Sequence, residues 1–563
     1  MKTWFFDVVK GSLLVAFFIS TLLLSASSER VFVSPDENAA FLFAKQFAQT
    51  GAFAIVEPLN AHLEGIIHAR SMVAVGTSIL PGAFLGIPFF TGSLLWIFGD
   101  AGALLFTPVL ALFAVLAWRK VVKELFDDPL LADFSAFFLM LHPAFLYYSG
   151  RVMMQNVAFV SFLIFGAYFL LAGPLHKLSK HYVSELKRFE YFLGGIFLGT
   201  ALFIRTEEIL WVLGLLAVLL YVYRSQIGWR NIAAVVFGLF IMGCVIGYVN
   251  DTVYGNALLT GYTARAEAGE TASSVSSLIP PSVSDMASYV FPFGIHPRAI
   301  MRHEWQYEFL LFPWMTIPAL VGFALLLVRK FDKNKTWKVF TVFSVVLAFW
   351  LGGMYGSWTF TDNPDPALIS IGNSYVRYWL PIFVTSTVFA AYAVVAVYRV
   401  IKHWVIGVGA DVSVDPRVSM RQRIRRLLPC LFIFLIAFTT VYLSANLVFS
   451  GHDGILPTRA ALATFQSKRR AVALKTEEGS IVIVDRADKY LFPTRKVVVP
   501  LRDERTYAAL PKMLEEAPVY YFGITLPQSD LDYLNNVKLA ENNLFITLVA
   551  TFDDESLYKI TKK

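Results

Sequence analysis

Long apolar segments separated by short charged loops make up most of the chain. A run of about 17–25 apolar residues is long enough to cross a bilayer as a helix. About eleven segments fit this pattern. They are 11–27, 101–118, 131–148, 156–172, 191–205, 208–223, 231–249, 309–328, 338–354, 375–398 and 427–448. A further apolar stretch, 79–98, is interrupted by prolines and glycines (Pro81, Gly82, Gly86, Pro88 and Gly92).

The distribution of lysine and arginine decides how the 79–98 stretch is interpreted. Short cytoplasmic loops are enriched in these residues. If 79–98 does not cross, the basic segments all fall on the cytoplasmic side; they are 119–123, 177–188, 224–230, 329–335 and 402–426. If 79–98 crosses the membrane, every later loop changes sides, and the basic segments no longer lie on the cytoplasmic side where they are expected. We therefore expect a re-entrant or interfacial helix pair at 79–98, covered by protein because unpaired backbone groups are costly in lipid.

The same topology assigns the remaining loops to the outer side of the membrane. These are 28–100, 149–155, 205–208, 250–308, 355–374 and everything after 449. Within the first outer loop, 38–49 and 64–75 are amphipathic and suited to lie in the interface plane. The first apolar segment could also be a signal peptide. We favour an uncleaved membrane anchor, because cleavage would release one end of that loop, and this makes the N-terminus cytoplasmic.

The C-terminal segment 450–563 has a different, more polar pattern. Alternating residues predict strands at 481–485, 496–499, 519–523 and 545–551, and helices at 505–516 and 529–535. The predicted fold class is therefore mostly α: a polytopic membrane protein with about eleven transmembrane helices. It has interfacial or re-entrant helices in the first outer loop and a small C-terminal extracytoplasmic α/β domain. The expected domains are 1–449 and 450–563.

Composition supports a membrane protein and excludes several other classes. Of the 563 residues, 56% are hydrophobic and only 16% are charged, more apolar than a typical soluble domain. The net charge of +7 comes mainly from short loops between spans, and no basic stripe interleaved with aromatics indicates nucleic-acid binding. Cys244 and Cys430 show neither a disulfide framework nor zinc-type spacing.

An acidic pair follows the first predicted span on the outer side, in Ser34-Pro35-Asp36-Glu37. The pair precedes an apolar run, so it is expected to open a helix. One interpretation is helix capping, in which carboxylates complement the helix dipole. The other is catalytic: Asp36 would act as a general base toward an acceptor hydroxyl.

Three arginines, Arg151, Arg205 and Arg377, lie on the outer side against the usual charge bias. The planar guanidinium matches the oxygens of a phosphate group, so each is a candidate phosphate ligand, together with the adjacent Tyr378. Simpler interpretations remain for all three. Arg151 could snorkel at the end of a span, Arg205 could pair internally with Glu208, and the aromatics around Arg377 could form an interfacial belt.

The outer loop 250–308 holds a second set of candidates, Tyr262, His296 and Arg298, which could contact substrate. Its serine-rich part, 271–285, is expected to be mobile and could act as a lid or be a plain connector. The scattered histidines of the outer loops do not form a metal-binding set. We therefore expect no metal.

The order and sidedness of these motifs resemble the GT-C superfamily of integral-membrane glycosyltransferases. The closest branch is the protein O-mannosyltransferase and aminoarabinose-transferase group. The matching features are Asp36-Glu37 in the first outer loop, the interfacial segments after it, the broken stretch 79–98, Tyr148 with Arg151, and Arg377-Tyr378 with Pro381. The resemblance covers roughly 30–450.

The resemblance implies inverting transfer of one sugar from a polyprenyl-phosphate donor to an acceptor hydroxyl, on a protein or a glycolipid. Asp36 would be the base, Glu37 would support it, and Arg151 and Arg377 would hold the lipid phosphate. No cofactor is implied beyond the lipid-linked donor. Two differences leave the sugar and the acceptor open. Gln155 or Asn156 stands where an acid often follows that arginine, and 81–92 lacks a double-Pro-Lys element.

Two other classes of function remain as alternatives. A transporter or flippase for a lipid-linked or polar solute would explain the many spans. It predicts charged residues at the bilayer midplane and internal repeats, whereas the spans here are almost free of charge and no repeat is evident. A receptor-like module that binds a partner through 450–563 would leave the arginines on the outer side unexplained.

Overall fold

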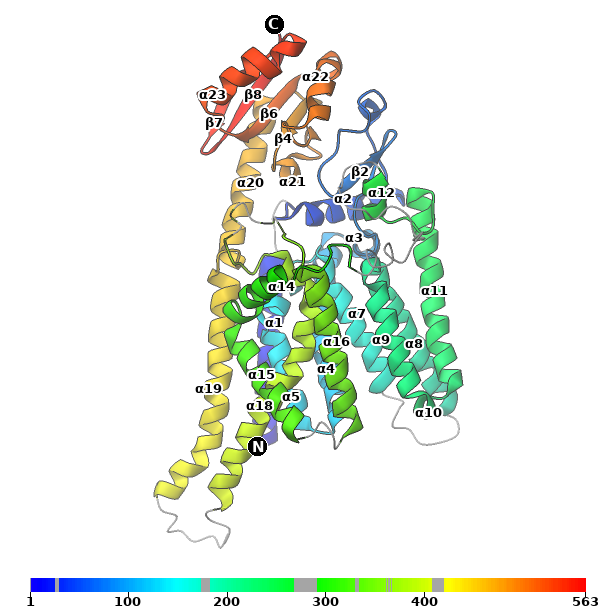
Figure 1. Cartoon of the computed structure of the whole chain (residues 1–563), viewed down its shortest axis with the longest axis vertical. Helices are drawn as coiled ribbons and strands as arrows, with labels where there is room; N and C mark the ends of the chain where they lie inside the picture. The colour runs from blue at the N-terminus through cyan, green and yellow to red at the C-terminus, as the bar shows by residue number, and fades with distance from the viewer. Residues whose placement is uncertain are drawn as a thin grey trace.

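The fold combines a bundle of long helices with a C-terminal sheet stacked beyond one end of it (Figure 1). The computed structural model describes residues 2–25, 30–173, 183–267, 291–329, 334–360, 362, 365, 367–407 and 420–563. The N-terminus lies at the end of the bundle far from the sheet. The C-terminus lies in the sheet region.

A helix falls on each of the predicted spans. The bundle helices are α1 (Lys2–Ser25), α4 (Asp100–Phe126), α5 (Pro129–Leu141), α6 (Pro143–Ser149), α7 (Gln155–Leu171), α8 (Val183–Ile204), α9 (Ile209–Val222), α11 (Trp229–Tyr254), α15 (Pro313–Arg329), α16 (Lys335–Gly356), α18 (Leu380–Gly407) and α19 (Met420–Ser450). By length and composition, five helices in the described ranges are able to cross a membrane, or seven if each bent pair is one span. The polytopic helical fold is confirmed, and the count of about eleven spans stays a prediction.

Small residues allow the bundle helices to pack closely, as is common between membrane helices. A Cβ atom added at Gly322 of α15 would lie 1.8 Å from the backbone oxygen of Phe389 in α18. A Cβ atom at Gly238 of α11 would lie 2.4 Å from the backbone oxygen of Phe192 in α8. Larger side chains at these two positions would force the helix pairs apart.

The first outer loop forms a layer between the bundle and the C-terminal sheet (Figure 1). It contains helices α2 (Pro35–Thr50) and α3 (Gly86–Phe98), the short 3-10 helix η1 (Pro58–Ala61), and strands β1 (Ile55–Val56), β2 (Met72–Val75) and β3 (Ser78–Pro81). The strands pair antiparallel in the order β1-β3-β2. Helix α12 (Gly261–Glu267), from a much later loop, contacts β2 in the same layer.

Two sequence predictions for this loop are wrong. The 64–75 stretch was expected to be an amphipathic helix, but it consists of turns and strand β2. The 79–98 stretch contains the end of β3 and the single helix α3, rather than a helix pair. Gly76, with φ of +59°, closes the β2–β3 hairpin in a left-handed conformation that glycine adopts readily. The pairing with β2 therefore draws 79–81 into a sheet.

Shorter elements connect the bundle helices. They are η2 (Thr206–Glu208), α10 (Arg224–Ile227), α14 (Pro297–Glu304), η3 (Trp305–Leu310) and α17 (Ser374–Tyr378). The helix pair that ends at Leu310 and resumes at Pro313 bends by 105°. The predicted span at 309–328 therefore begins only at Pro313, which lacks the backbone donor needed to continue a helix.

The C-terminal region is a mixed sheet with helices, as expected. Helix α20 (Ile455–Lys475) leads from α19 into β4 (Ile481–Val484), α21 (Asp488–Leu491), β5 (Lys496–Val498), α22 (Glu504–Glu516), β6 (Val519–Ile524), α23 (Gln528–Tyr533), η4 (Leu534–Lys538), η5 (Ala540–Asn542), β7 (Leu544–Phe552) and β8 (Glu555–Lys562). The strand order is β5-β4-β6-β8-β7. Strands β5, β4 and β6 are parallel, and β8 and β7 are antiparallel. The four predicted strands and two predicted helices are confirmed; α20 and β8 were not predicted.

Candidate active site

Helix α2 presents the acidic pair at its first turn. Ser34 is the N-cap residue, and its side chain accepts a hydrogen bond from the backbone N–H of Asp36 at 3.2 Å. The Glu37 carboxylate accepts in return from the backbone N–H of Ser34 at 3.3 Å, which completes a capping box. Pro35 occupies the first helical turn, where its missing donor costs nothing. The capping interpretation is therefore confirmed for Glu37.

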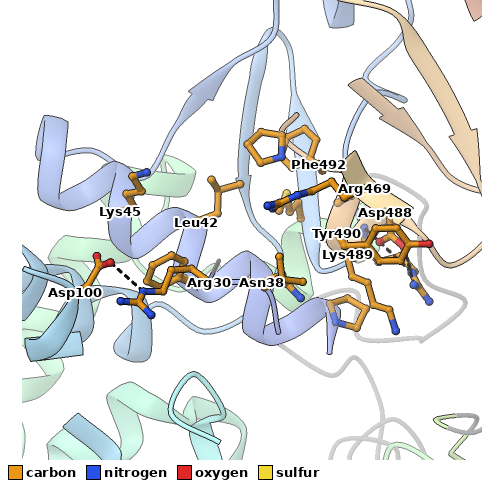
Figure 2. Close-up of a pocket in the computed structure, with 17 residues that line it drawn as sticks. Arg30, Asn38, Leu42, Lys45, Asp100, Arg469, Asp488, Lys489, Tyr490 and Phe492 are labelled. Atoms are coloured by element: carbon orange, nitrogen blue, oxygen red, sulfur yellow. Dashed lines mark hydrogen bonds and ion pairs between the residues drawn. The ribbon is translucent and has the colours of Figure 1, made fainter. Parts of the chain in front are cut away.

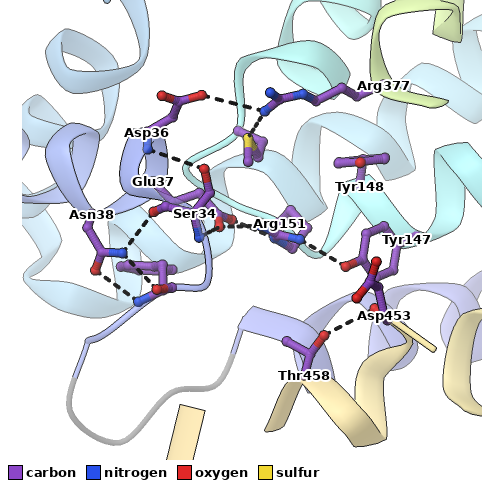
Figure 3. A network of polar contacts seen from close by, with 12 residues as sticks. Ser34, Asp36, Glu37, Asn38, Tyr147, Tyr148, Arg151, Arg377, Asp453 and Thr458 are labelled. Carbon is purple, nitrogen blue, oxygen red and sulfur yellow. Dashed lines mark hydrogen bonds and ion pairs between the residues drawn. The ribbon is translucent and has the colours of Figure 1, made fainter. Parts of the chain in front are cut away.

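Glu37 also forms a buried ion pair with Arg151, from the turn between α6 and α7 (Figure 3). The Nε of Arg151 donates to Glu37 Oε1 at 2.7 Å, and a second guanidinium nitrogen donates to Oε2. A third bond runs from Arg151 to the hydroxyl of Tyr147 at 2.9 Å. The side chains of Glu37 and Arg151 are only 1% and 8% exposed. The pair therefore fixes the start of α2 on the bundle, and the phosphate contact expected of Arg151 stays a prediction.

Asp36 points toward a different set of residues. Its Oδ1 accepts a hydrogen bond from the hydroxyl of Ser71 at 2.5 Å. Its Oδ2 lies 3.6 Å from a guanidinium nitrogen of Arg377, as Figure 3 shows. The Asp36 side chain is 29% exposed. An ionised carboxylate has about four acceptor positions, so this one keeps capacity for a further donor. A general base requires a carboxylate that is held in one orientation and lies within hydrogen-bond reach of the substrate.

Arg377, in α17, has unused hydrogen-bonding capacity beside Asp36. Its terminal nitrogens donate to the sulfur of Met154 at 2.9 Å and to the hydroxyl of Ser374 at 2.8 Å. Its Nε is buried and has no hydrogen-bond partner among the described residues. A methionine sulfur is a weak acceptor, so the guanidinium is poorly satisfied. An anionic oxygen brought next to Asp36 would supply the missing acceptor.

Arg205 is engaged in a buried cluster of its own. Its Nε and a terminal nitrogen donate to Glu208 at 3.1 and 2.8 Å, and it also pairs with Glu207. The hydroxyl of Tyr355 lies 3.0 Å from the same guanidinium. The internal ion pair with Glu208 is therefore confirmed. The centre of the Tyr378 ring lies 4.7 Å from the Arg205 guanidinium carbon and 5.0 Å from that of Arg377, so the ring contacts both cations.

The candidates of the loop 250–308 divide into two groups. Tyr262 of α12 packs its ring on Phe84 at 4.9 Å. Burial, and then the negative charge of Asp36, raises the pKa of Tyr262, so its phenol stays protonated and is able to donate. His296 and Arg298 are exposed on and before α14, and no contact joins them to the Asp36 cluster in the described ranges. The serine-rich 271–285 segment lies outside the described residues.

No sequence motif indicated Ser71, or Asp488, which binds the residue before Ser71. Ser71 has a left-handed φ of +62°, and Arg70 before it binds Asp488 of α21. The Arg70 backbone N–H donates to Asp488 at 2.9 Å, and its guanidinium donates at 2.6 and 3.0 Å. The Asp488 side chain is 0% exposed. The C-terminal region therefore holds the segment whose next residue bonds Asp36.

No group of three or more His, Cys, Asp or Glu side chains placed to hold a metal ion occurs among the described residues. The charged groups near Asp36 are instead arginines and their carboxylate partners. The chemistry available at the site is proton acceptance by Asp36 and binding of an anion by Arg377.

Comparison with known proteins places the fold. No protein-family model and no curated protein matches the chain. Among solved structures, ArnT from Cupriavidus metallidurans bound to undecaprenyl phosphate aligns at a TM-score of 0.53 with 13% identity, over 99% of this chain and 98% of ArnT. The oligosaccharyltransferase AglB from Archaeoglobus fulgidus, in complex with an inhibitory peptide and a dolichol-phosphate, aligns at 0.57 with 11% identity, over 95% of this chain and 71% of AglB.

The chain therefore has the fold of the GT-C class of membrane glycosyltransferases, to which ArnT and AglB belong. The resemblance drawn from the sequence motifs is confirmed at the level of the fold. The match to ArnT also extends over nearly the full length of both chains, including the C-terminal sheet region.

The buried pair generates a prediction about stability. Glu37→Ala or Arg151→Ala leaves one charge buried without a partner, so each should destabilise the protein by about 3–5 kcal/mol. The double variant Glu37→Ala/Arg151→Ala removes both charges and should be less destabilised than the two single effects added together. The measurement is the free energy of unfolding in detergent. It is compared between the wild type, the two single variants and the double variant as a double-mutant cycle.

An exposed ion pair provides the matched control for this cycle. Arg502 and Asp530, 68% and 39% exposed, pair at 2.8 Å on the C-terminal region. Removing either of them should change stability by no more than about 1 kcal/mol. Effects of similar size for the buried and the exposed pair would contradict the structural role of Glu37 and Arg151.

Proposed function

We propose that this protein is an integral-membrane glycosyltransferase that moves a single sugar, with inversion, from a polyprenyl-phosphate donor to an acceptor hydroxyl. One observation carries the proposal: the partly exposed Asp36 carboxylate lies 3.6 Å from Arg377, whose Nε has no partner among the described residues. The solved ArnT and AglB structures add support, because they contain undecaprenyl phosphate and a dolichol-phosphate.

The proposed reaction is a single displacement at the anomeric carbon. Asp36 accepts the proton of the acceptor hydroxyl as its oxygen bonds to that carbon. The bond between the carbon and the donor phosphate breaks, and its electron pair leaves with the phosphate. Because the leaving group is a stable anion, no strong general acid is required. Attack from the face opposite the leaving group inverts the anomeric configuration.

Arg377 would stabilise the charge that grows on the departing phosphate. A preorganised donor of this kind contributes roughly 3–4 kcal/mol to the transition state. Arg151 and Arg205 are already bound by carboxylates, so in this proposal they chiefly position Glu37 and Tyr378, with a phosphate contact as a secondary role. Tyr262, which is close enough to Asp36 to be influenced by its charge, would contact the substrate, and His296 and Arg298 would contact the more distant part of the acceptor.

The orientation in the membrane is part of the proposal. Helix α2, whose first turn holds Asp36, and the C-terminal sheet lie beyond the end of the bundle opposite the N-terminus (Figure 1). The basic segments 119–123, in α4, and 224–230, in α10 and at the start of α11, belong to the N-terminal end. The positive-inside bias then makes the N-terminus cytoplasmic and the C-terminal region extracytoplasmic. The acceptor, a protein or a glycolipid, is met on the outer face, and the sugar is a hexose or a related sugar.

The first functional prediction concerns the base. Asp36→Asn keeps the size of the side chain and removes its proton affinity, so it should lower turnover by about 100- to 10,000-fold. Folding and donor binding should remain. The measurement is transfer from a polyprenyl-phosphate sugar panel, together with melting temperature. Asp532→Asn, at an exposed position in α23, is the matched control and should be fully active. Near-normal turnover of Asp36→Asn would contradict the assignment.

The second functional prediction concerns the binding of the donor phosphate by Arg377. A ligand that binds only the folded protein raises its melting temperature by mass action. Bare polyprenyl phosphate should stabilise the wild type, and Arg377→Ala should bind it roughly 10- to 100-fold more weakly, the worth of one charged hydrogen bond. Arg502→Ala, a surface arginine, should bind normally. No stabilisation of the folded wild type by any such lipid would favour the transport alternative.

The third functional prediction is that sugar transfer does not depend on a metal ion. The proposal assigns charge stabilisation to arginine, so transfer should continue at an unchanged rate after dialysis against EDTA. The assay compares rates before chelation, after chelation, and after adding back Mg²⁺ or Mn²⁺. A loss of activity that either ion restores would overturn this part of the proposal.

A further inference from the structure

A second charged cavity lies between α2 and the C-terminal region (Figure 2). Its volume is about 250 Å³. On one side it is lined by α2, by the residues just before α2, by residues 69–72 and by the start of α4. On the other side it is lined by α20, by α21 and by the segment that follows α21. The cavity is therefore formed only where the first outer loop meets the C-terminal region.

The cavity is distinct from the candidate active site because it uses another face of α2. The lining residues on this helix include Asn38, Leu42 and Lys45, which share one face because they are spaced by three or four positions. With about 100° of rotation per residue, Asp36 lies on roughly the opposite face. Neither Asp36 nor Arg377 lines the cavity.

Positive charge predominates in the lining. Five basic residues line the cavity against two acidic ones; the basic residues are Arg30, Lys45, Arg70, Arg469 and Lys489. Both acids are already paired: Asp100 with Arg30 at 2.9 Å, and Asp488 with Arg70 at 2.6 Å. Figure 2 shows these two pairs on opposite sides of the cavity. With five basic and two acidic side chains in its lining, the cavity has a positive potential.

The side chain of Lys489 is partly buried and lies against an aromatic ring. It forms no ion pair with a carboxylate in the described part of the chain, and its ammonium lies 4.3 Å from the centre of the Phe465 ring. Burial, and then the neighbouring Arg70, lower the pKa of Lys489 to about 8. A partly buried cation of this kind is stabilised when an anion enters beside it.

The remaining walls are apolar, so the ligand need not be a bare ion. Phe41, Leu42, Met72 and Phe492 supply hydrophobic surface. Arg30 follows α1, and Asp100 begins α4, so one side of the cavity lies at the outer ends of two bundle helices. Lipid headgroups lie at that level of a membrane protein.

We propose that this cavity is a binding site for a phosphate group carried by an organic molecule, held by Lys45, Arg469 and Lys489 between the Arg30–Asp100 and Arg70–Asp488 pairs. The site is separate from the Asp36–Arg377 pair, and the proposal does not depend on the proposed glycosyl transfer. The phosphate could belong to an anionic lipid headgroup or to a soluble phosphate ester. Both have the same chemistry at the cations.

The test measures binding to the full-length protein in detergent. Melting temperature is recorded with inorganic phosphate, with phosphatidic acid and with phosphatidylcholine, at constant ionic strength. Phosphate and phosphatidic acid should stabilise the wild type, and Lys45→Gln/Lys489→Gln should weaken their binding by about 10- to 100-fold. Phosphatidic acid binding much more tightly than phosphate identifies a lipid ligand; similar affinities identify a soluble one.

Three controls keep the proposal falsifiable. Lys562→Gln, a surface lysine of β8, should bind as the wild type does. Lys45→Gln alone changes an exposed side chain, so it should fold and still weaken binding. Arg377→Ala should leave binding at this cavity unchanged. The proposal is overturned if neither phosphate nor phosphatidic acid stabilises the wild type, or if their binding is lost in Arg377→Ala but not in the lysine variants.

Discussion

The buried ion pair between Glu37 and Arg151 is the constraint on which the arrangement of the site depends. Two charges at 1% and 8% exposure are tolerated only if each is fully bonded, because desolvation is costly. Their bidentate geometry, together with the hydroxyl of Tyr147, leaves little freedom at the start of α2. Asp36, the residue just before Glu37 in the same helical turn, is consequently held where its carboxylate lies 3.6 Å from Arg377.

The three outer arginines differ because of their partners. Arg151 has Glu37, and Arg205 has Glu207 and Glu208. Arg377 has a methionine sulfur, a serine hydroxyl and a carboxylate at 3.6 Å. A guanidinium bound by carboxylates at close range has most of its charge neutralised, whereas Arg377 keeps a buried donor without an acceptor. This contrast is the reason why Arg377 is the proposed phosphate ligand, whereas Arg151 and Arg205 are bound by carboxylates of the protein.

The C-terminal region also contributes to the candidate active site, although it lies far from Asp36 in sequence. Asp488 binds Arg70, and Lys496 binds Glu57 at 2.5 Å. Both contacts hold the first outer loop from the side opposite the bundle. Because Ser71 follows Arg70 directly and bonds Asp36, the loop is held from both sides at Asp36. The junction between the first outer loop and the C-terminal region also encloses the basic cavity. One interface therefore supports Ser71 beside Asp36 and forms the second cavity.

The sequence alone determined the class of fold and the acidic pair at the start of α2, and it predicted the sidedness of the charges. Those features depend on local patterns: apolar run length, the loop bias of lysine and arginine, and the capping motif at Ser34. The tertiary structure alone decided which charges are neutralised, because Glu37 and Arg151 are 114 positions apart. It also placed 72–75 in strand β2, because pairing with β3 outweighed the helical pattern, and it brought Ser71 to Asp36. Long-range pairing of this kind leaves no periodic signal in a single sequence.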